Sequence, residues 1–271
     1  MTSAEVATPA PERRRRRDAR DRAILIVQRL VLLAVLLAGW EAAVAYGKIQ
    51  ALWVSRPSAI ATTLWEFFVG GSIYPHLLTT LGNALAGLAA GSLGGIVLGF
   101  LMARFDRFGK IIDPFINFFY SIPRIALAPL FVLWFGIGLG SKVATIFAIV
   151  FFLLLVNTVT GIRQVDRHLV RGMQAMGATR WQINRYVVIP STLVWILAGL
   201  RLAIPQSVIG AVIAEYVGAT KGLGYLILFA SANLDTTTVL SAVVVLGVIS
   251  ILITEIVNKV ESILLRWNAS T

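Results

Sequence analysis

Few side chains in this sequence are of the types that perform covalent chemistry. The sequence contains no cysteine, which excludes disulfides, thiolate metal sites and cysteine nucleophiles. It contains two histidines, His76 and His168, which lie far apart in the chain. No H-E-x-x-H motif is present, and no serine has a histidine placed to act as its base. The sequence therefore predicts a chain that is not an enzyme and that has no catalytic residues and no metal site.

A phosphate-binding loop is also missing. Such a loop requires the order G-x-x-x-x-G-K-[ST], and the nearest sequence, GIGLGSK at residues 136–142, lacks that order. We therefore expect no nucleotide or other cofactor on this chain. If ATP drives its function, ATP and Mg²⁺ belong to a partner subunit.

The composition shows which class of protein remains. The 271 residues are 58% hydrophobic and 14% charged, whereas an ordinary soluble domain is about a quarter charged. The 23 glycines and 9 prolines are spread out rather than periodic, which excludes a collagen-like or disordered chain. The composition predicts a polytopic protein of a cell membrane.

The hydropathy pattern predicts how this chain crosses the bilayer. A helix needs about 20 apolar residues to cross the hydrocarbon core, in which no backbone polar group can stay unpaired. Pro114, Pro123 and Pro129 interrupt the third candidate, so we expect it to be kinked or unwound, with protein rather than lipid around the break. The six candidates are Ala23–Tyr46, Leu77–Ala103, Ile111–Phe135, Lys142–Ile162, Ser191–Val217 and Thr238–Leu265.

The basic residues predict the orientation of these spans, because Lys and Arg of short loops stay on the cytoplasmic side. Arginines and lysines cluster in residues 13–22, 104–110 and 163–185, and Lys259 and Arg266 lie at the far end of the last span. The opposite segments offer only Lys48, Arg56, Lys142 and Lys221. Both termini are therefore predicted to be cytoplasmic.

The N-terminal residues 1–22 are predicted to be a disordered basic tail that precedes a membrane domain over residues 23–271. Their arginines explain much of the net charge of +11, and we favour a positive-inside anchor over a nucleic-acid site. A cleaved signal peptide is the other alternative, because Ala43, Val44 and Ala45 form an A-x-A-like site. The apolar run is longer than the roughly 7 to 15 residues of a signal sequence, so we expect an uncleaved span.

The longest cytoplasmic loop, about residues 163–190, carries an amphipathic pattern. Leu169, Met173 and Met176 share one helical face, and Gly177 is a plausible stop at the helix C-terminus. Such a helix could dock into a groove on a partner protein through its methionines. It could equally lie in the lipid headgroup region, and the pattern leaves both interpretations open.

The end of this loop has a recognisable motif. Gly177, nine residues, and then Val187, Val188, Ile189 and Pro190 resemble the EAA-loop signature of binding-protein-dependent ABC importer permeases. Aligned on Gly177, the EAA triplet falls on Arg171, Gly172 and Met173, so a basic residue replaces the acidic one. This departure puts any ion pair of that acidic residue with the ATPase in doubt, while the glycine turn and the apolar face remain.

The resemblance extends from about Trp53 to Trp267. The segments Ile125–Lys142, Asn157–Gly161 and Ala198–Leu202, together with Ala214, Glu215 and residues 222–224, are similar to the nitrate, sulfonate and taurine branch of these permeases.

The resemblance implies a type I ABC importer permease fold and a set of partners. These are an ATP-binding subunit in two copies, a second and identical permease subunit, an extracytoplasmic substrate-binding protein and the inner membrane. It implies a small anionic cargo, such as a sulfonate, taurine, nitrate or a related organic acid. In the family this loop forms the coupling helix, which implies ATPase-coupling roles for Leu169, Arg171, Gly172, Met173, Gln174, Ala175, Met176, Gly177, Ala178 and Pro190.

Three residues of the fifth span are candidates for the translocation path or its gate. Arg201 lies near half depth, where it either faces an anionic cargo or makes a structural pair, and we favour the structural pair. Pro205 could let the helix bend. Glu215, toward the outer end, is a candidate for the external gate.

The competing function is an ion-gradient-driven carrier or channel. Such a protein needs carboxylates at the membrane midplane, and the candidates Asp113 and Glu255 lie near the inner surface instead.

Overall fold

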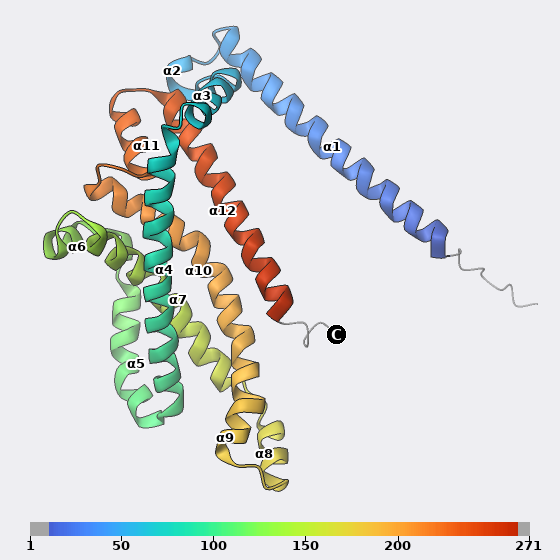
Figure 1. The fold of residues 1–271 in the computed structure, drawn as a ribbon, viewed down its shortest axis with the longest axis vertical. Helices are drawn as coiled ribbons and strands as arrows, with labels where there is room; N and C mark the ends of the chain where they lie inside the picture. Colours follow the sequence, from blue (N-terminus) through green and yellow to red (C-terminus); the bar gives the residue numbers. More distant parts are fainter. Residues whose placement is uncertain (1–10, 265–271) are drawn as a thin grey trace, which may run out of the picture.

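The computed structural model describes residues 11–264 of the chain, with side chains over residues 24–259. All elements in this part are helical (Figure 1). The helices are α1 Pro11–Ala45, α2 Ala51–Val54, α3 Pro57–Val69, α4 Ile73–Arg104, α5 Asp106–Ser121, η1 Arg124–Leu127, α6 Ala128–Phe135, α7 Leu139–Arg163, α8 Arg167–Ala175, α9 Arg180–Ile183, η2 Asn184–Val188, α10 Ile189–Gly218, α11 Leu223–Ala232 and α12 Thr236–Leu264.

The predicted membrane spans are present, five as single helices and the third as a bent pair. Within the described residues the single helices long and apolar enough to cross a bilayer are Ile24–Ala45, Ile73–Arg104, Leu139–Arg163, Arg180–Gly218 and Thr236–Lys259. The α8–α9 turn and the α4–α5 junction lie at one end of the molecule, and α2, α3 and α11 lie at the other (Figure 1). This alternation agrees with the predicted path of the chain.

The third span is broken, as the prolines predicted. Asp106–Ser121 and Arg124–Phe135 meet at an angle of 84°. The break lies at Ile122, whose extended backbone (ψ 133°) is the conformation that the following Pro123 favours. Pro114 lies inside α5, and Pro129 lies in the first turn of α6, where proline is tolerated. Of the three prolines, only Pro123 therefore lies at the break.

Helices α4, α7 and α10 pack together and form the centre of the fold. Their shared core contains Ala84, Ile146, Val150, Leu154, Ala203, Val208 and Ala211, which are all at most 3% exposed. A second cluster joins Ile73, Leu223, Val245 and Ile249 and attaches α11 and α12 to the outer end of α4. This core holds the spans on either side of the α8–α9 turn in a fixed relation.

A row of glycines makes the α4–α7 contact unusually close. A Cβ added to Gly87 would lie 2.4 Å from the Ile146 Cβ, and one added to Gly95 would lie 2.4 Å from the Phe151 carbonyl oxygen. A Cβ added to Gly91 or to Gly99 would lie 2.9 Å from an atom of the same helix. The small face of the second span therefore serves helix packing, in the way that small residues do between membrane helices.

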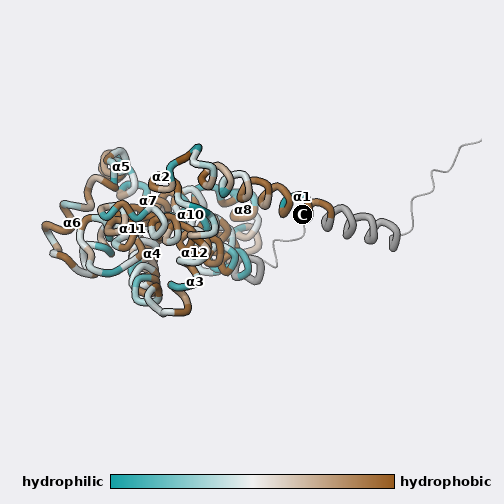
Figure 2. The backbone as a smooth tube through the Cα atoms, turned by 90° about the horizontal axis from the view of Figure 1, so that it is seen from above, coloured by the Kyte–Doolittle hydropathy of each residue, from teal (hydrophilic) through white to brown (hydrophobic). Residues whose placement is uncertain are grey.

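Helix α1 stands apart from the other spans. It runs away from the group of helices in both views (Figures 1 and 2). Its side chains from Ile24 to Leu37 are all exposed, and all of them except Gln28 and Arg29 are apolar. Near its end, Glu41 accepts hydrogen bonds from the backbone N–H and the hydroxyl of Ser58 in α3.

Helix α1 begins at Pro11, within the predicted basic tail. Residues 1–10 lie outside the described part, and the disordered tail over residues 1–22 stays a prediction. Arginine and alanine are good helix formers, and proline is tolerated in a first helical turn.

Candidate functional site

The loop between α7 and α10 folds into two short helices. Helix α8 begins after Asp166, whose carboxylate accepts a hydrogen bond of 2.7 Å from the backbone N–H of His168. Helix α9 begins after Thr179, which forms a capping box with Gln182. From α9 the chain continues through the π-turn η2 and Pro190 into α10, so α9 and the fifth span form one continuous apolar helix. The turn is therefore connected to that span without an intervening loop.

Gly177 makes the turn between the two helices. Its φ is +78°, in the left-handed region that favours glycine. Its N–H donates to the Gln174 carbonyl at 3.0 Å, and the Ala178 N–H donates to the Met173 carbonyl at 3.0 Å. These two bonds make a Schellman motif, which satisfies the last carbonyls of α8. The sequence prediction of a glycine stop is confirmed.

The turn presents apolar side chains away from the chain. Met176 is 79% exposed and Leu169 is 56% exposed, while Met173 of the same face is half-buried. Beside them, Trp181 is 62% exposed and lies under the guanidinium of Arg185, 5.0 Å from the ring centroid. Of the remaining predicted coupling residues, Arg171, Gly172, Gln174 and Ala175 are exposed, whereas Ala178 and Pro190 are half-buried.

A second polar feature lies inside the membrane domain, at the break in the third span. Here an open cavity of about 400 Å³ is lined by residues 120–125, by Ile149 of α7 and by one face of α10. The α10 face contributes Gln206, Ile209 and Ile213. The cavity joins the unwound backbone to the exposed side of α10.

Arg124 is the charged residue of this cavity, and the sequence reasoning missed it. Its guanidinium lies over the Tyr120 ring at 4.7 Å and near the Phe152 ring at 5.5 Å, and it donates a weak bond to the Tyr120 carbonyl at 3.5 Å. The signal was available: Arg124 lies in the middle of the predicted third span, where an uncompensated arginine is costly.

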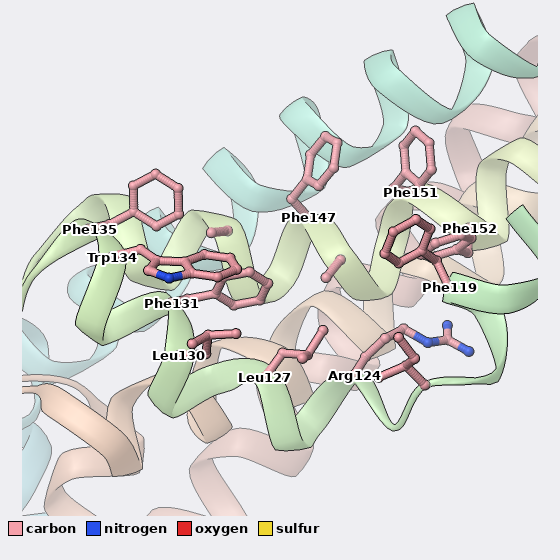
Figure 3. A pocket seen from close by; sticks show the side chains of 13 residues that line it. Phe119, Arg124, Leu127, Leu130, Phe131, Trp134, Phe135, Phe147, Phe151 and Phe152 are labelled. Carbon is pink, nitrogen blue, oxygen red and sulfur yellow. The ribbon is translucent and has the colours of Figure 1, made fainter. Parts of the chain in front are cut away.

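Next to this cavity, and sharing Arg124 with it, lies an apolar pocket of about 540 Å³. Aromatic rings from α5, α6 and α7 line it, and Figure 3 shows the guanidinium of Arg124 at one end beside Phe119 and Phe152. Arg124 thus lies between a ring-lined pocket and a more polar cavity.

The three predicted path residues do not line the cavity. Arg201 is exposed on α10 and has an interaction partner within the described chain. Pro205 is half-buried, and α10 continues through it without ending. Because proline has no N–H, it leaves the Arg201 carbonyl without its usual helical donor.

Glu215 is buried at the outer end of α10, with 1% of its surface exposed. Its carboxylate accepts hydrogen bonds from Thr80 at 2.9 Å, from Asn83 at 3.0 Å and from the backbone N–H of Gly224 at 2.9 Å. The Thr80 hydroxyl in turn accepts from the Leu223 N–H at 2.8 Å. These bonds join α4, α10 and the start of α11 at the outer end of the molecule.

The two histidines are separated, as expected. His76 lies in α4, where Nδ1 is 3.0 Å from the Gly222 carbonyl oxygen and its ring stacks on Tyr225. His168 lies in the first turn of α8 at the opposite end of the molecule. Among the described residues, no group of three or more His, Cys, Asp or Glu side chains could hold a metal ion.

Comparisons with known proteins agree with this arrangement. Residues 95–266 match the family of the binding-protein-dependent transport system inner membrane component. The chain is 34% identical over 240 residues to a riboflavin transport system permease protein of Chloroflexus aurantiacus, covering 89% of this chain and 90% of that protein. It is 37% identical to a formylaminopyrimidine transport permease protein of Halalkalibacterium halodurans, covering 78% and 85%.

A taurine transport system permease protein of Escherichia coli is 30% identical, over 87% of this chain and 88% of that protein. Among solved structures, an inward-facing form of the MetNI methionine ABC transporter matches with a TM-score of 0.58 at 20% identity, over 70% of this chain and 96% of the matched chain.

The fold is that of a type I ABC importer permease, and the family excludes the alternative of an ion-gradient-driven carrier. In this family ATP hydrolysis takes place on a separate subunit, so the chain is not itself an enzyme, and an ATPase and a substrate-binding protein are its general partners. The chain belongs to the binding-protein-dependent permeases, as a multi-pass inner-membrane subunit of an ABC importer.

Proposed function

We propose that two copies of this chain form the membrane pathway of the importer, that two copies of an ATP-binding subunit bind ATP and Mg²⁺ beneath them, and that residues 163–190 couple the two. The α8–α9 turn is the main support for this proposal, because it lies at the predicted cytoplasmic end and exposes Leu169 and Met176. Exposed apolar side chains of this kind are typical of an interaction surface.

The geometry supports a mechanical role for the turn. The Schellman motif at Gly177 and the capping box at Thr179 fix the angle between α8 and α9. Helix α9 continues into the fifth span, and α8 follows directly on the fourth. A partner that pulls on Met176 would therefore move two spans together. Arg171 occupies the position of the family's acidic residue, so that position does not supply an acidic partner for an ion pair. The apolar contact is therefore the main link to the ATP-binding subunit.

The proposed cargo is a small anionic solute, such as a sulfonate, taurine, nitrate or a related organic acid. Relatives named for the transport of aliphatic sulfonates and taurine support this class, although others are named for riboflavin and formylaminopyrimidine. A cation inside the membrane domain, Arg124, lowers the electrostatic barrier for an anion and supports the same class.

Purification of the tagged full-length chain from its native membrane tests the assembly. The expected result is copurification of an ATP-binding subunit and ATP-dependent uptake of taurine or an alkanesulfonate after reconstitution with the binding protein. Uptake that continues when ATP hydrolysis is blocked would contradict the proposal. ATP-dependent uptake of riboflavin alone would keep the importer and overturn the proposed cargo.

A further inference from the structure

We infer that the cavity at the break in the third span is a solute-binding site within the membrane, in which Arg124 and Gln206 bind the acidic group of a small organic anion that has a short apolar body. The inference rests on the proposed transport of an anionic solute and adds the residues that would recognise it.

Arg124 lies deep within the membrane domain. Helix α5 rises from the cytoplasmic end for 16 residues before the break, and Arg124 then lies beside Phe152, near the middle of the 25-residue helix α7. An arginine at this depth costs on the order of 3 kcal/mol to insert, so it normally faces protein, water or a ligand. The break in the span therefore accommodates a charged side chain within the membrane.

In the described part of the chain, aromatic rings rather than an acidic residue hold the guanidinium of Arg124. The Tyr120 and Phe152 rings lie close to the guanidinium, and the Tyr120 carbonyl accepts one long bond. Among the residues whose side chains are described, no carboxylate neutralises Arg124. Ring contacts position the side chain but leave most of its five N–H donors for another acceptor. A carboxylate or sulfonate supplies paired oxygens that match this fork.

The walls of the cavity combine polar and apolar side chains. Gln206 stands on the α10 side of the cavity with an amide that can donate to the same acid group. The hydroxyl of Ser121, on the opposite wall, donates to the Asn117 carbonyl at 2.8 Å. Ile149, Ile209 and Ile213 line the same cavity and would contact an apolar body. The volume of about 400 Å³ lies within the usual range of about 300–1,000 Å³ for small-molecule sites. The walls therefore favour an organic anion over an inorganic one such as nitrate.

The absence of cysteine from the natural sequence allows a direct test by single-cysteine labelling. The variant Gln206→Cys is prepared in the full-length chain within the complete transporter, in native membrane vesicles. Two thiol reagents of similar size are compared, the anionic sulfonatoethyl and the cationic trimethylammonioethyl methanethiosulfonate. Ser72→Cys, in an exposed turn, is the aqueous reference, and Leu93→Cys, on an exposed apolar face of α4, is the lipid-facing control.

The expected result is that Gln206→Cys reacts faster with the anionic reagent, relative to Ser72→Cys, and that Leu93→Cys reacts with neither. Adding Arg124→Gln should reduce this preference by about tenfold, as expected for removing one nearby charge at intermediate dielectric. Arg124→Lys should keep it. Millimolar butanesulfonate should slow the labelling, whereas butyltrimethylammonium should not.

Three results would overturn the inference: no labelling of Gln206→Cys while Ser72→Cys reacts, a charge preference that is unchanged by Arg124→Gln, or equal protection by the two butyl compounds. If Gln206→Cys does not accumulate, Ser121→Cys on the opposite wall provides the same readout. A transporter that retains ATP-dependent uptake of an alkanesulfonate but fails these tests would refute the site alone and leave the proposed function standing.

Discussion

At the residue scale, the α8–α9 turn depends on the left-handed backbone of Gly177, and the outer end of the molecule depends on the buried carboxylate of Glu215. Gly177 was predictable, because a glycine after an amphipathic stretch is a common helix stop. The burial of Glu215 was not, because its donors come from α4 and from the segment at Gly224, which are distant in the sequence. Arg124 could have been predicted as a costly charge, but its cavity depends on how the broken span packs against α10.

Gly177→Ala should destabilise the α8–α9 turn by about 1–2 kcal/mol, because an alanine is strained at φ +78°. The expected effect is less solute transported per ATP hydrolysed, with the subunits still assembled. Gly247→Ala is the control: that glycine is inside α12, away from the turn, and a Cβ there meets nothing within 4 Å. Equal coupling ratios in the two variants would argue against the turn.

Glu215→Ala should lower the thermal stability of the transporter, because three hydrogen-bond donors lose their acceptor in a buried place. Each buried donor left unpaired costs roughly 1–3 kcal/mol. Glu66→Ala, on the exposed side of α3, provides the control. A melting temperature that is the same for both variants in lipid nanodiscs would show that the cluster does not hold the outer ends of the helices together.

At the scale of elements, the sequence predicted the spans to within a few residues but not how they pack. Apolar length identifies a membrane helix, whereas the close α4–α7 contact depends on which glycines face a neighbour. The sequence also gave no strong pattern for the short outer helices α3 and α11, because they need not cross the membrane. The break at Pro123 was predicted, but the direction of α6 after it is set by contacts with α7.

Gly95→Ala should destabilise the α4–α7 pair, since the added Cβ would lie 2.4 Å from the Phe151 carbonyl oxygen and 2.9 Å from the Leu155 backbone nitrogen. Gly82→Ala, in the same helix but with nothing within 4 Å of its added Cβ, should leave stability unchanged or raise it. The measurement is the melting temperature of each variant in nanodiscs. A lower value for Gly82→Ala than for Gly95→Ala would contradict the packing described here.

At the scale of the whole molecule, the six apolar stretches and the basic residues at their cytoplasmic ends determine the topology. No contact between helices is needed to predict it. The helices α4, α7 and α10 then form a core that connects the α8–α9 turn to the cavity at the third span. The sequence alone could not show this connection, because it arises from tertiary packing. The sequence alone also could not show the partner subunits or the number of copies of each, because these depend on the surfaces that this chain presents to other chains.

The claim that the α8–α9 turn transmits force from an ATPase is tested most directly by photo-cross-linking. A benzophenone maleimide is attached to Met176→Cys in the otherwise cysteine-free chain, within the complete transporter, and Leu93→Cys is the matched exposed control. If the turn contacts the ATPase, position 176 forms an adduct with the ATP-binding subunit and position 93 forms none. Adducts from position 176 with lipid or with the chain itself alone would contradict the claim.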